Sequence, residues 1–84
     1  MVRMDEEEIR GLDRRGPALV YMAVADDIAR RIEAGELKSG DRVPGELEMA
    51  STYGIARMTV ARAIKELRDR ELVQTVRGKG TFVL

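Results

Sequence analysis

The basic side chains in the last third of the chain are the residues best suited to chemistry, because they can bind a polyanion. Residues 55–84 hold seven Lys and Arg against three Asp and Glu, whereas residues 18–54 hold four against seven. Arginine can pair with guanine O6 and N7, and both basic side chains bind phosphate. This asymmetry indicates a polyanionic partner, although a solvated helix face of mixed charge explains the charge pattern equally well.

The candidate DNA-binding residues differ in the contact that each is expected to make. Arg57 is the best candidate for reading bases, since a cation at a helix start opposes the helix dipole and suggests a function. Thr59 is short enough to touch a base methyl or a phosphate, while the other basic side chains would mostly bind phosphate. The two glycines of the last loop let the backbone approach DNA closely. The predicted set is Arg57, Met58, Thr59, Arg62, Lys65, Arg77, Gly78, Lys79 and Gly80.

Three helices must position these residues. Apolar residues at helical spacing predict helices over 18–34, 46–53 and 57–70, and Pro17 suits a first helical position. Glycines follow the first two helices, as is typical of a left-handed C-terminal stop. Leu47, Met49, Ala50 and Tyr53 are expected to supply the apolar contacts of the second helix. Met49 and Met58 are expected to pack rather than to bind a ligand.

Two short β-branched stretches, 72–76 and 81–84, flank Arg77-Gly78-Lys79-Gly80 and predict a β-hairpin. The expected fold is therefore mainly α with a small β-hairpin: three helices plus a wing, which is a winged helix-turn-helix. Residues 17–84 form this domain. Residues 1–16 hold little apolar content and are expected to be a flexible or loosely docked arm.

Composition excludes several other classes. The chain has no cysteine and no histidine, which excludes disulfides and the usual Cys/His zinc sites. No catalytic residues, metal or cofactor are predicted, and the acidic run at 6–8 is interpreted as solvated. No apolar run could span a bilayer and the acidic N-terminus does not resemble a signal peptide, so a cytoplasmic location is expected.

Residues 21–83 resemble the DNA-binding domain of GntR-type bacterial transcription regulators, and the HutC-like branch most closely. The resemblance is carried by the segments 32–44, 54–60, 63–67, 72–73 and 77–83, which occur in the family's order and spacing. It implies a homodimeric regulator, expected to be a repressor, whose third helix and wing bind a pseudo-palindromic double-stranded operator. The arm and the exposed face of the first helix are possible dimer surfaces.

The chain departs from the family pattern at five positions. Gly45 and Ala56 stand where the family has residues whose side chains cap a helix. Leu47 and Ala61 stand where it has arginines, and Glu71 stands where it has a glycine. We therefore expect an intact fold with weaker or altered DNA recognition.

The family also carries a C-terminal effector-binding domain. The sequence ends at Leu84, which leaves open an excised domain or a natural stand-alone module, and in either case no small-molecule effector site is expected within these residues. The neutral overall charge and the lost arginines leave one alternative open, a winged-helix module for protein–protein contact.

Overall fold

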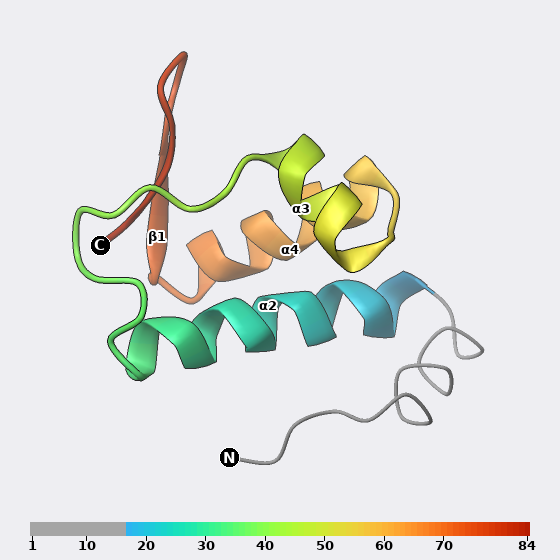
Figure 1. Ribbon diagram of the computed structural model, residues 1–84, viewed down its shortest axis with the longest axis horizontal. Coiled ribbons are helices and arrows are strands. Elements are labelled where there is room, and N and C mark those ends of the chain that lie inside the picture. The colour runs from blue at the N-terminus through green and yellow to red at the C-terminus, as the bar shows by residue number, and fades with distance from the viewer. Residues whose placement is uncertain (1–16) are drawn as a thin grey trace.

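A computed structural model describes residues 17–84, which form three helices followed by an antiparallel hairpin (Figure 1). The predicted arm at residues 1–16 lies outside the described residues. The elements are α2 (Pro17–Glu33), α3 (Glu46–Tyr53), α4 (Arg57–Asp69), β1 (Val73–Val76) and β2 (Gly80–Val83). The predicted mainly α fold with a wing is confirmed, and the predicted bounds differ from the observed ones by one residue at six of the ten helix and strand ends.

Glycines end the first two helices, as predicted. Gly35 follows α2 with φ 80°, and Gly54 follows α3 with φ 67° and donates its N–H to the carbonyl of Ala50. The N-cap residues that precede α3 and α4, Gly45 and Ala56, are both extended and cap no N–H with a side chain. The helix starts therefore lack the stabilisation of about 1 kcal/mol that a side-chain cap gives.

The core lies where α4 packs between α2 and α3. Each element contributes the apolar face that its sequence period predicts. The buried residues are Val24, Ala25, Ile28, Val43, Met49, Val60, Ala63, Ile64, Leu67, Val73 and Val83. Two predicted packing residues are exposed instead: Leu47 is 65% exposed and Met58 is 79% exposed. Both lie in the first turn of their helices, outside the stripe that meets the core, so the packing expected for them was wrong.

The buried pair of the wing lies at its base. Val73 pairs with Val83 and both are buried, whereas the rest of β1 is exposed. The hairpin projects away from the three helices, with its loop at the far end (Figure 1). The wing therefore extends beyond the helical layer and presents its loop to solvent.

The connector between α2 and α3 pairs with the wing through an isolated bridge. Arg42 makes an antiparallel bridge with Phe82, and the Val43 N–H donates to the Thr81 carbonyl at 2.8 Å. The Val83 N–H donates to the Asp41 carbonyl, also at 2.8 Å. Figure 1 shows this segment crossing the base of the hairpin. The edge of β2 is thus covered, which fixes the base of the wing.

Candidate nucleic-acid interface

The first turn of α4 presents an arginine and a methionine to solvent. The Arg57 side chain is 61% exposed, and its Nη2 lies 3.9 Å from Oε1 of Glu46 in the first turn of α3. An exposed pair at this separation is worth about 1 kcal/mol or less, so it loosely orients Arg57 and leaves it available. Thr59 is half-buried beside them. The predicted reading residues Arg57, Met58 and Thr59 therefore occupy one end of α4.

The next two predicted residues on α4 already have partners. The Arg62 guanidinium lies 4.5 Å from the centre of the Tyr21 ring on α2, a cation–π contact. Lys65 Nζ forms an ion pair with Asp69 at 3.0 Å. Arg62 and Lys65 are exposed and lie with Met58 on one stripe of the helix. Their charge is therefore presented to solvent on the same side as Met58, but the charge of Lys65 is partly neutralised.

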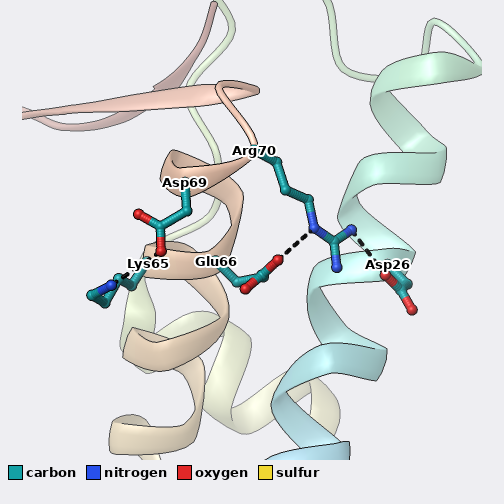
Figure 2. A network of polar contacts seen from close by, with 5 residues as sticks. All are labelled: Asp26, Lys65, Glu66, Asp69 and Arg70. Carbon is teal, nitrogen blue, oxygen red and sulfur yellow. Dashed lines mark hydrogen bonds and ion pairs between the residues drawn. The ribbon is translucent and has the colours of Figure 1, made fainter.

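The second half of α4 is tied to α2 by a network of charged side chains (Figure 2). Arg70 contacts Glu66 Oε2 through Nε at 2.8 Å and Asp26 Oδ1 through Nη1 at 2.9 Å. The hydrogen bond to Glu66, followed by that to Asp26, raises the pKa of the Arg70 guanidinium above its ordinary value. Arg70 thus forms its ion pairs within the domain, and these pairs hold α4 against α2.

A second polar cluster joins α2 to α3. The Tyr53 hydroxyl donates to Asp27 Oδ2 at 2.6 Å, and the same carboxylate contacts Arg30 and Arg31. Burial first, and then the hydrogen bond to Asp27 and its negative charge, raise the pKa of the Tyr53 phenol above its ordinary range. Tyr53 therefore remains a hydrogen-bond donor at neutral pH, and fixes the helix that precedes the turn into α4.

The wing loop carries cations with no ion-pair partner among the described residues. Arg77 and Lys79 are exposed, and within residues 17–84 no carboxylate lies within ion-pair distance of either one. Gly78 has φ 77°, the left-handed conformation that this three-residue hairpin loop requires. The structure thus brings the predicted residues 77–80 together in one exposed loop and leaves its positive charge available.

Two basic residues outside the predicted set also belong to this surface. Arg68 Nη1 donates to Thr75 Oγ1 on β1 at 2.9 Å, which connects α4 to the wing. Arg42 comes from the connector and lies against Gly80. Arg68 lies in the predicted third helix but outside the predicted site, and Arg42 occurs in a stretch with no periodic pattern. Only the pairing of the connector with β2 could have identified Arg42.

Other site chemistries find little support in this part of the chain. No group of three or more Asp, Glu, His or Cys side chains in residues 17–84 is placed to hold a metal ion. No helix among these residues is both long enough and apolar enough to cross a membrane. The exposed basic side chains at the start of α4 and in the wing loop are therefore the feature that indicates a ligand, and their charge favours a polyanion.

Comparison with known proteins gives a consistent result. The family model described as bacterial regulatory proteins, gntR family, matches residues 20–83. The chain is similar to the histidine utilization repressor of Klebsiella aerogenes, with 40% identity over 70 residues, 83% of this chain and 29% of that protein. It is also similar to the repressor MngR of Escherichia coli, with 36% identity over 64 residues, 76% of this chain and 27% of that protein. The chain spans less than a third of the length of either repressor.

A solved structure shares both the fold and part of the sequence. The DNA-binding domain of AraR, crystallised in complex with operator ORR3, superimposes with a TM-score of 0.74 at 33% identity. The match covers 76% of this chain and 77% of that one. The described domain therefore has the architecture of a winged helix-turn-helix that was solved on DNA.

Proposed function

This chain belongs to the GntR family of bacterial regulatory proteins, and we propose that it binds a specific double-stranded operator and regulates transcription as a repressor. Its fold is the winged helix-turn-helix DNA-binding domain of that family. The observation that carries the proposal is the pairing of an exposed α4 start with a wing loop whose cations have no carboxylate partner within residues 17–84. The repressors and the operator complex to which the chain is similar support the same function.

In this proposal α4 enters the major groove with its N-terminal residues at the base edges. Arg57 pairs with a guanine through O6 and N7, and Thr59 contacts a base methyl or a phosphate. Met58 is 79% exposed, so an apolar surface is presented beside Arg57. The thymine C5-methyl is the apolar group of the major groove, and we assign it to Met58.

The wing supplies contacts outside the major groove. Arg77 and Lys79 bind the adjacent phosphates or the minor groove, and Gly78 and Gly80 bring the loop backbone close to the sugar-phosphate chain. Arg62 and Lys65 add phosphate contacts from α4, where Lys65 exchanges its exposed pair with Asp69 for a phosphate. Contacts of this kind position the protein and make binding depend strongly on salt.

The regulator acts as a homodimer on a pseudo-palindromic site in this proposal. Two symmetric copies would place their α4 helices in major grooves about 34 Å apart, or a multiple of that distance. We assign no catalytic residue, cofactor or metabolite site to residues 17–84.

Binding-site selection from a pool of random duplex DNA tests the proposal. The expected result is enrichment of an inverted repeat whose half-sites contain guanine and thymine at adjacent positions. Recovery of sequences with no common motif, at an affinity equal to that for bulk DNA, would contradict specific operator binding.

A second candidate function is docking of another protein on the same face. Leu47 and Met58, in the first turns of α3 and α4, are both mostly exposed, and Ala61 on α4 carries no charge. An exposed apolar surface of this kind is typical of a protein interface. Failure to bind any duplex at low salt would favour this function over operator binding.

A further inference from the structure

Arg42 lies at the base of the wing although it is far from the wing in sequence. Its backbone bridges to Phe82 of β2, and hydrogen bonds from Val43 to Thr81 and from Val83 to Asp41 flank this bridge at 2.8 Å each. The connector backbone is thus held as firmly as a strand. Arg42 is therefore a fixed part of the wing surface.

The Arg42 side chain crosses the position where β2 begins. A Cβ built on Gly80 would lie 2.7 Å from Arg42 Nε and 3.4 Å from its Cζ and Nη2. Gly80 also has φ 129°, a conformation that favours glycine. Gly80 thus leaves room for the guanidinium, which lies against the backbone at the position that follows Lys79.

No acid neutralises this guanidinium within the described residues 17–84. The neighbouring carboxylate of Asp41 accepts instead the backbone N–H of Lys38 at 2.8 Å. Arg42, Arg77 and Lys79 are all exposed and lie at one hairpin. Three like charges held together without a counter-charge form a surface that favours a polyanion.

We propose that Arg42 is a DNA phosphate-binding residue, and that Gly80 keeps its guanidinium aimed at the strand that the wing contacts. This inference rests on the proposed operator binding. It adds to the interface a residue of the connector, so that the wing surface is built from two segments of the chain. The Arg42 contact carries no base information, because a phosphate is the same at every position.

The test measures the dissociation constant of the full chain against salt concentration, for the selected operator and for random duplex DNA. Arg42→Gln should lower the affinity for both DNAs by the same factor, which is roughly eight-fold at 0.1 M salt for one released counterion. It should also reduce the slope of log affinity against log salt concentration by about 0.9. Arg31→Gln is the matched control, since it removes the same charge from the end of α2. Equal slopes for Arg42→Gln and Arg31→Gln would overturn the inference.

A coupling experiment tests the role of Gly80. Gly80→Ala should weaken binding in the wild-type background but add little in the Arg42→Gln background, where the guanidinium that it displaces is gone. An equal loss in both backgrounds would overturn the coupling and assign the effect to backbone strain. If the wild-type chain bound no duplex at low salt, the proposed function itself would fail. If the wild-type chain bound DNA but Arg42→Gln behaved like its control, only the role of Arg42 would fail.

Discussion

Arg68 on α4 donates a hydrogen bond of 2.9 Å to Thr75 on β1, and Thr75 Oγ1 lies 3.0 Å from Thr81 Oγ1 on the opposite strand. The register pairs Thr75 directly with Thr81. This chain of polar contacts reaches past the buried base of the wing at Val73 and Val83. It links the helix proposed to read DNA with the hairpin proposed to contact the DNA backbone.

Thr75→Val should loosen the wing without unfolding the domain. Valine keeps the β-branched shape but removes the hydroxyl, and an exposed hydrogen bond contributes about 1 kcal/mol or less to stability. We expect higher backbone mobility for residues 75–81 in NMR relaxation, and weaker binding to operator and random DNA alike. Asp69→Ala is the control for the mobility measurement, because it breaks the exposed pair with Lys65 on α4 without touching the wing. Unchanged mobility of the loop in Thr75→Val would show that this contact does not hold the wing.

Glu71 carries a strain that glycine would relieve. It is the one residue other than glycine in the described part of the chain with a positive φ, at 61°. A left-handed conformation costs a non-glycine residue about 1–2 kcal/mol, while glycine loses about 0.5–1 kcal/mol more backbone entropy on folding. Glu71→Gly should therefore raise the free energy of unfolding by about 0.5–1 kcal/mol in urea denaturation. Glu71→Ala keeps the strain and should give no such gain; the reverse order of the two variants would rule out this explanation.

Tyr53→Phe tests the contact between α2 and α3. Loss of the hydrogen bond to Asp27 should lower the free energy of unfolding by about 1 kcal/mol at pH 7. The folded state raises the pKa of the phenol, so the contribution of this group is fully present below the unfolded pKa of about 10 and is lost as pH rises above that value. The stability difference between wild type and Tyr53→Phe should be constant from about pH 7 to 9 and shrink at higher pH. A difference that grows above pH 10 would contradict the assigned shift.

The sequence predicted the helices well because their signals are local. The apolar period lies within each helix, and the glycines at 35 and 54 follow the first two helices; the structure confirms both signals. Leu47 and Met58 were misjudged because an apolar residue in the first turn of a helix can lie on either side of the core stripe. The strand pairing of Arg42 depends on β2, some forty residues later in the chain, and no local pattern encodes it. The site residues that lie on one helix or in one loop were therefore predicted from the sequence. Arg42 was missed because its place in the site depends on two segments that are distant in the sequence.

Met58 should distinguish thymine from uracil in the selected operator. Replacing thymines in the half-site by deoxyuridine removes only the C5-methyl, and a lost methyl contact is worth about 0.8 kcal/mol, or roughly four-fold in affinity. The wild-type chain should bind the deoxyuridine operator more weakly, and Met58→Ala should bind both operators equally. Deoxyuridine placed outside the half-sites is the matched control. If Met58→Ala retained the full preference for thymine, the methyl contact would have to belong to another residue, and Thr59 would be tested next.

Variants of Arg57 and Lys79 should have different effects on DNA binding, one on sequence specificity and the other on overall affinity. Arg57→Ala removes the proposed bidentate contact to guanine, so it should cost about 1–3 kcal/mol on the operator and much less on random DNA. Lys79→Ala removes a phosphate contact, so it should weaken binding to all sequences about equally and reduce the salt slope by about 1. Fluorescence anisotropy titrations of both variants on both DNAs, over a series of salt concentrations, give the four comparisons.

Because Arg57 also contacts Glu46, Glu46→Gln is the control for loss of that ion pair, and it should leave the operator preference in place. An equal loss on operator and random DNA for Arg57→Ala would remove Arg57 from the reading residues and shift specificity to Met58, Thr59 and the wing.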